Sequence, residues 1–162
     1  MQGGYCRCSG LRDDNLTMTR ESWHQGTYSH QWGTSPIVGV VWGLLGVHQT
    51  APAWATFTVK PKIGSLHHAT ATVPTIRGFI NVTAKPGSVE VGVPCNAEAT
   101  LCVPRSAQDH GLLTPESHRL LLDGAEVAAI AAGGHLCTSE PLSCGVGGSP
   151  RRLSAQQRGG WL

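Results

Sequence analysis

The sequence predicts a mainly β protein, an antiparallel β-sandwich preceded by a loop and one apolar helix. Five segments with strand-like composition follow one another between residues 53 and 103, separated by proline, glycine and asparagine. The chain of 162 residues contains 21 Gly and 10 Pro, too many helix-breaking residues for a helical bundle. Apolar residues make up 40%, which is too many for a wholly disordered chain. Short strands and frequent turns in about one domain of sequence favour a sandwich.

Composition divides the chain into four segments. Residues 1–14 form a Gly-rich and then charged leader without an assigned element. Residues 15–49 hold a polar and aromatic loop and the apolar helix, and residues 50–132 hold the sandwich. Residues 133–162 are predicted to be a disulfide-stapled or ragged tail, rich in Gly, Arg and Gln from residue 145 onwards.

The helix is predicted over residues 35–47. Ser35 suits the N-cap and Pro36 the first helical position, and a nearly continuous apolar run follows. A helix that is apolar nearly all round is expected to be buried against other elements. The run is about half as long as a membrane span needs, so no membrane span is predicted.

The predicted strands are bounded by turns. Residues 53–59 alternate large apolar with small or polar residues, which is the period of a half-buried strand. The other predicted strands are residues 65–73, 76–84, 88–93 and 98–103, with weaker ones near 119–122 and 126–131. Residues 104–118 are predicted to form a polar loop, and Asp123-Gly124 a tight turn.

The six cysteines fall into three close pairs. They stand at positions 6, 8, 95, 102, 137 and 144. The seven-residue spacing within the last two pairs suits a hairpin staple better than a zinc site, so Cys95–Cys102 and Cys137–Cys144 bridges are plausible and no metal is expected. Six cysteines allow fifteen connectivities, and the sequence does not choose among them.

Two features bear on the compartment and the class of partner. Sequons at Asn15 and Asn81, together with the cysteines, indicate an oxidising, secretory context, whereas residues 1–8 lack the pattern of a signal peptide. A true N-terminus further upstream would reconcile the two. The formal net charge is +2 and the longest basic run is Arg151-Arg152, so neither nucleic acid nor a membrane surface is an expected partner.

A single carboxylate marks the candidate site. Glu21 is the only acidic residue between Asp14 and Glu90, and its neighbours are indole, imidazole and hydroxyl side chains. Aromatic faces stack on sugars, imidazoles bond their hydroxyl groups, and an acid transfers the proton, so this mixture suits a sugar site. The alternative is an ordinary surface loop with an Arg20–Glu21 salt bridge.

Two stretches in the same order resemble a known family, the α-L-rhamnosidases of glycoside hydrolase family 78. Residues 17–23 (Thr-Met-Thr-Arg-Glu-Ser-Trp), residues 28–30 (Tyr-Ser-His) and the apolar helix ending at Leu-Gly-Val resemble the end of its catalytic barrel. Residues 53–61, 78–82 and 93–104 resemble its C-terminal β-sandwich, including a proline-bounded hairpin with Asn after the first proline.

The resemblance implies an inverting hydrolase of terminal α-L-rhamnose, built from an (α/α)6 barrel followed by a sandwich. By position, Glu21 matches the general base and His30 a histidine that contacts rhamnose. Trp23 matches an indole beside the base, which implies that it packs near the sugar as a second substrate-binding residue. Arg20 stands where many members have an aromatic residue. The implied partner is a rhamnose-containing glycoside, and no cofactor is implied.

Only the last helix of such a barrel can be placed in this chain. The general acid belongs to sequence that the chain does not contain, so the isolated chain is predicted to be an inactive C-terminal fragment with an exposed apolar surface on its helix. Two alternatives stay open. One is a non-catalytic sandwich that binds carbohydrate through Trp23, Trp32 and Trp54, and the other is a disulfide-stapled structural domain.

Overall fold

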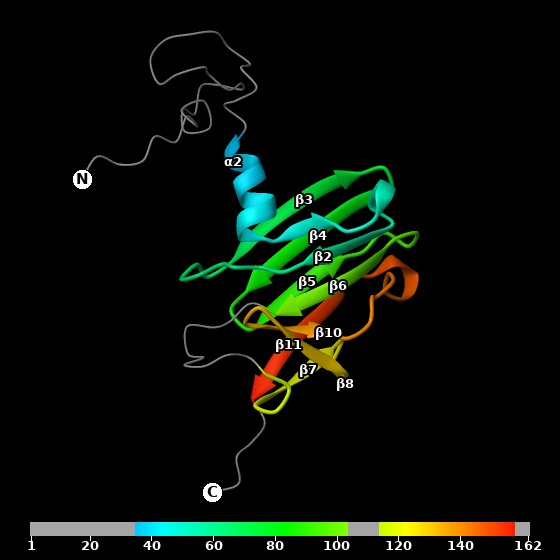
Figure 1. Cartoon of the computed structure of the whole chain (residues 1–162). Coiled ribbons are helices and arrows are strands. Elements are labelled where there is room, and N and C mark those ends of the chain that lie inside the picture. The colour runs from blue at the N-terminus through cyan, green and yellow to red at the C-terminus, as the bar shows by residue number, and fades with distance from the viewer. Residues whose placement is uncertain (1–34, 104–113, 158–162) are drawn as a thin grey trace, which may run out of the picture. The chain divides into compact units, whose positions relative to one another are not determined.

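The computed structural model describes residues 35–103 and 114–157, and their strands form two sheets (Figure 1). One sheet has five strands in the order β1-β2-β6-β10-β9, and the other has six in the order β3-β4-β5-β11-β7-β8. Both belong to the unit that comprises residues 41–162. The predicted β-sandwich is confirmed, with more than five strands.

The five-stranded sheet joins distant parts of the sequence. Its strands are β1 (Val47–Gln49), β2 (Thr56–Val59), β6 (Glu98–Val103), β10 (His135–Thr138) and β9 (Ala129–Ala132). The β2–β6 pair is parallel, and the other pairs are antiparallel. Because β1 already belongs to this sheet, the sandwich begins slightly before the predicted boundary at residue 50.

The six-stranded sheet is antiparallel throughout. Its strands are β3 (Ala69–Thr75), β4 (Gly78–Lys85), β5 (Ser88–Gly92), β11 (Arg151–Gln157), β7 (His118–Leu122) and β8 (Ala125–Val127). Adjacent chain segments form β3, β4 and β5, whereas β11 comes from the far end of the sequence.

Alternating apolar residues of both sheets form a single core. Its largest fully buried side chains are Phe57, Leu45, Ile80, Leu101, Leu120, Leu136 and Leu153. In β5 the alternation is visible in the sequence, because Val89 and Val91 are buried while Ser88 and Glu90 lie on the opposite face. The same alternation therefore defines an outer face of polar side chains.

Several predicted strand boundaries are wrong. Residues 65–68, which the predicted strand 65–73 included, precede β3 and are exposed. Residues 52–54 form a 3-10 turn, and β2 starts only at Thr56. The predicted strand 126–131 is divided between β8 and β9, which lie in different sheets.

The tight turn at Asp123-Gly124 is confirmed. Both residues have positive φ, 51° and 90°, as the mirror-image turn of a two-residue hairpin requires. The turn joins β7 to β8, and an Asp123 carboxylate oxygen accepts a hydrogen bond of 2.8 Å from the backbone N–H of Arg152. The turn is thereby attached to the start of β11.

The prediction of a ragged tail from residue 145 is wrong for residues 151–157. They form β11, which pairs with β5 on one side and β7 on the other (red in Figure 1). Leu153 of this strand is fully buried. The sandwich therefore extends well beyond the predicted boundary at residue 132.

The two local cysteine bridges that the seven-residue spacing made plausible do not form, although the four bridged residues are those expected. The bridges are Cys102–Cys137 and Cys95–Cys144. Cys102 in β6 and Cys137 in β10 are direct partners in an antiparallel ladder, which brings their β-carbons together. An isolated antiparallel bridge joins Ala99 to Leu142, and these residues lie close in sequence to Cys95 and Cys144. Cys6 and Cys8 lie outside the described residues.

Candidate functional site

The predicted catalytic residue and its neighbours lie outside the described residues. This applies to Glu21, Trp23, His30 and Trp32. Their roles stay predictions, and the described structure begins with the helix that follows them.

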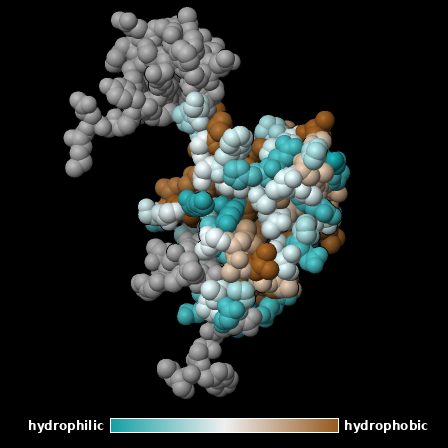
Figure 2. All heavy atoms as spheres, viewed as in Figure 1, coloured by the Kyte–Doolittle hydropathy of each residue, from teal (hydrophilic) through white to brown (hydrophobic). Residues whose placement is uncertain are grey.

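That helix carries an exposed apolar surface. It consists of an α-helical turn, α2 (Ser35–Val38), and a π-helical segment, η2 (Gly39–Leu44), and so it ends before the predicted residue 47. The exposed fractions are 53% for Ile37, 48% for Val38, 40% for Val40 and 57% for Trp42. Figure 2 shows hydrophobic surface in this region. The expectation of a buried helix is wrong, and the exposed apolar surface expected of a fragment is present.

A glycine fixes the junction between this helix and the sandwich. Gly46 has a φ of 61°, and a β-carbon there would collide with the carbonyl group of Lys60. The Lys60 N–H donates to the Gly46 carbonyl at 3.1 Å, and the Lys62 N–H donates to the Leu44 carbonyl at 2.8 Å. The end of η2 is therefore bonded to the segment that follows β2.

Trp54 contributes to the packing of the sandwich. It is half-buried against the core and meets Phe57 edge-on, with 6.2 Å between the ring centroids. Ala53 and Trp54 both have positive φ, and Arg77 donates from Nε to the Ala53 carbonyl at 2.7 Å. This arrangement gives no support to Trp54 as a stacking platform for a sugar.

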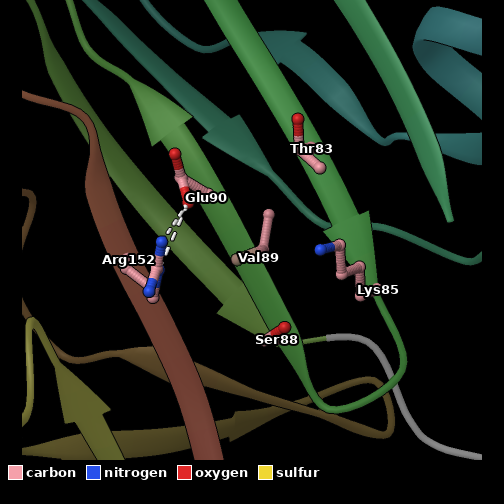
Figure 3. A pocket seen from close by; sticks show the side chains of 6 residues that line it. All are labelled: Thr83, Lys85, Ser88, Val89, Glu90 and Arg152. Atoms are coloured by element: carbon pink, nitrogen blue, oxygen red, sulfur yellow. Dashed lines mark hydrogen bonds and ion pairs between the residues drawn. The ribbon is translucent and has the colours of Figure 1, made fainter.

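A polar hollow lies on the outer face of the six-stranded sheet (Figure 3). Its volume is about 220 Å³, and it is lined by Thr83, Lys85, Ser88, Val89, Glu90 and Arg152. A second, wider hollow of about 480 Å³ shares Glu90 and Arg152 and adds Asp123, Gly124, Pro150 and Ser154. The two hollows adjoin at Glu90 and Arg152 on the outer face of β4, β5 and β11. From here on, the term polar hollow refers to both together.

Two ion pairs lie on one side of this surface. Arg152 donates to a single oxygen of Glu90 from Nη2 at 2.8 Å and from Nε at 3.2 Å. Arg151 Nε lies 3.0 Å from the other carboxylate, that of Asp123. Lys85 lies across the hollow from the Glu90–Arg152 pair and makes no ion pair with another described residue (Figure 3).

One of the two sequons lies on the same outer face. Asn81 is exposed on β4, two residues before Thr83, and its side-chain oxygen accepts a hydrogen bond of 2.8 Å from Thr72. Gly92 is its partner on β5, so no side chain stands beside it there. Glycosylation of Asn81 stays a prediction, and Asn15 lies outside the described residues.

The described residues hold neither a cluster of metal-binding side chains nor a membrane-spanning helix. No group of three or more His, Cys, Asp or Glu residues in the described ranges is close enough to hold a metal ion. Within the same ranges no helix is long and apolar enough to cross a membrane.

The first half of the sandwich is similar to a known protein family. Residues 46–116 match the family described as the bacterial alpha-L-rhamnosidase C-terminal domain. The matched residues make up less than half of the chain. The match begins at the glycine of the helix–sandwich junction and includes strands β1 to β6. It agrees with the family that the sequence resembles.

Solved structures of rhamnosidases share the fold. The alpha-L-rhamnosidase of Dictyoglumus thermophilum matches 84% of this chain with 17% identity and a TM-score of 0.58. The Streptomyces avermitilis alpha-L-rhamnosidase complexed with L-rhamnose also matches 84%, with 13% identity and a TM-score of 0.60. The chain spans only 16% and 12% of the length of these two proteins. No curated protein matches the chain.

The polar hollow is absent from the sequence-based predictions. The sequence predicts strands β4 and β5 but does not predict β11. The ion pair between Glu90 and Arg152 depends on β11, because this strand carries Arg152. The visible signal is the alternation in β4 and β5, which places Thr83, Lys85, Ser88 and Glu90 on one face.

Proposed function

We propose that this chain is the C-terminal part of an inverting α-L-rhamnosidase, which hydrolyses terminal α-L-rhamnose from glycosides. The observation that carries the proposal is a rhamnosidase-type sandwich over residues 46–116, directly preceded by a helix with an exposed apolar surface. In a barrel, neighbouring helices would cover Ile37, Val38 and Val40. Burial of that much apolar surface would favour association with the rest of the barrel.

Glu21 is the proposed general base. In an inverting glycosidase the base activates a water molecule on the face of the sugar opposite the general acid, and the two carboxyl groups stand about 6.5–9.5 Å apart. His30 would contact the rhamnose and Trp23 would pack beside the base. These three residues precede the apolar helix in the sequence, as they do at the end of the barrel that the chain resembles.

The isolated chain is proposed to be inactive. A base without a general acid lacks one of two contributions that are each worth about 10²–10⁴-fold in rate, and the groups that position the sugar are missing as well. The active protein would be a longer polypeptide that supplies the acid. Two disulfides in the sandwich favour an oxidising compartment for that polypeptide.

The experiment compares the 162-residue chain with the longer native polypeptide on an aryl α-L-rhamnoside, while NMR identifies the first anomer released. We expect the longer polypeptide to release β-L-rhamnose first and the chain alone to release none. Release of the α-anomer would contradict inversion. Turnover by the chain alone would contradict its proposed inactivity, and an inactive longer polypeptide would overturn the proposed function.

The carbohydrate-binding alternative is not supported in its predicted form. Of its three tryptophans, only Trp54 lies in the described structure, and it packs against Phe57. A sugar-binding role for the sandwich would need another surface.

A further inference from the structure

The polar hollow arises from the register of three neighbouring strands. Thr83 of β4 is the partner of Glu90 of β5, and Glu90 is the partner of Arg152 of β11. These three side chains form a row across the sheet, with strands about 4.8 Å apart. The row presents a hydroxyl group, a carboxylate and a guanidinium side by side.

A second polar row runs beside the first. Lys85 is the partner of Ser88, and Ser88 is the partner of Ser154. The rows are separated by two residues along each strand, or roughly 7 Å. Short serine side chains next to the long ones of Lys85, Glu90 and Arg152 leave the space that forms the hollow.

One side of the hollow carries the Glu90–Arg152 ion pair, and the other side carries the ammonium group of Lys85. The Glu90–Arg152 pair is neutral overall and keeps further hydrogen-bonding capacity, because both contacts of the guanidinium go to one carboxylate oxygen. Lys85 adds an ammonium group without an ion pair to another described residue. Lys85 and Glu90 are diagonal neighbours, about 7–8 Å apart at their α-carbons.

We propose that the polar hollow binds an anionic sugar residue of a glycan, of the hexuronate class. The Lys85 ammonium would bind the sugar carboxylate. Glu90 would accept hydrogen bonds from sugar hydroxyl groups, while Arg152, Ser88 and Thr83 would complete the hydrogen-bonding set. The proposal goes beyond rhamnose hydrolysis and does not depend on it.

The composition of the hollow favours this ligand over other anions. Glu90 would repel a compact anion such as phosphate placed between it and Lys85, whereas a hexuronate presents neutral hydroxyl groups to Glu90 and its charge to Lys85. No aromatic side chain lines the hollow, so a ligand that depends on stacking is not favoured. A ligand that combines several hydroxyl groups with one carboxylate fits this lining.

The test is calorimetric titration of the folded 162-residue chain, prepared without N-glycans so that Asn81 carries none on this face. The probes are trigalacturonate, galactotriose of the same linkage, and inorganic phosphate. We expect binding of trigalacturonate at least about tenfold tighter than of either other probe. Equal binding of galactotriose or phosphate, or no binding of trigalacturonate, would overturn the proposal.

Three variants and a matched control locate the site. Lys85→Gln and Glu90→Gln are each expected to weaken trigalacturonate binding about fivefold to tenfold, whereas the control Lys62→Gln changes another exposed lysine and should have no effect. Ser88→Leu fills the hollow without changing charge and should weaken binding at least as much. Unchanged binding in Lys85→Gln or in Ser88→Leu would overturn the proposal. Failure here would leave the hydrolysis experiment unaffected.

Discussion

Glu21→Gln in the longer, active polypeptide is expected to reduce kcat by at least about 10²–10⁴-fold while rhamnose binding is largely preserved. The substitution keeps the size of the side chain and removes the carboxylate that would activate water, so it acts on the chemical step. Steady-state kinetics with an aryl α-L-rhamnoside and calorimetric titration with rhamnose measure the two effects separately.

Glu140→Gln is the matched control for Glu21→Gln. Glu140 is an exposed carboxylate of the sandwich, so its loss should leave both kcat and rhamnose binding near those of the unchanged protein. Retention of full turnover in Glu21→Gln would exclude Glu21 as the general base. Loss of rhamnose binding together with turnover would assign Glu21 to binding instead.

Removal of the Cys102–Cys137 bridge by the double substitution Cys102→Ser/Cys137→Ser is expected to lower the free energy of unfolding by about 2–5 kcal/mol. The bridge links residues 35 apart in sequence and joins β6 to β10 within the five-stranded sheet. Its loss enlarges the conformational freedom of the unfolded chain. Urea unfolding followed by tryptophan fluorescence measures the difference.

The Cys95–Cys144 bridge offers a comparison within the same protein. It links residues 49 apart, so Cys95→Ser/Cys144→Ser should cost a similar amount. Each of these double variants should contain no new reactive thiol. Two new thiols in either variant would support the pairing of Cys95 with Cys102 and of Cys137 with Cys144, which differs from the bridges in the structure.

Local patterns in the sequence predict much of the fold. In β5, for example, Val89 and Val91 alternate with Ser88 and Glu90, and the strand lies within one residue of its predicted bounds. The turn at Asp123-Gly124 is predicted by residue types that tolerate positive φ. Such features depend on residues that are close together in the sequence, so a local sequence pattern is enough to predict them.

Features that depend on distant partners are not predictable in this way. β11 contains one large apolar residue, Leu153, among polar ones, and its place between β5 and β7 becomes evident only when the sheet is assembled. The cysteines are a second case. The equal seven-residue spacing favours local hairpin bridges, but the pairing of β6 with β10 places Cys102 opposite Cys137.

The exposure of the helix shows that the burial of an element depends on partners that its own sequence does not reveal. Its apolar composition predicts burial, yet Ile37 and Trp42 are more than half exposed. Both observations agree if the partners of the helix are other helices of a longer protein. For the same reason the candidate site could be predicted only in part, since Glu21 would need a general acid from outside this chain.

The size of the native polypeptide tests the central claim most directly. An antibody raised against residues 53–104 of the sandwich would detect it in extracts of the source. A band several times heavier than 17.1 kDa is the predicted result, because the proposed rhamnosidase needs the remainder of its barrel. A native band near 17.1 kDa would contradict the account.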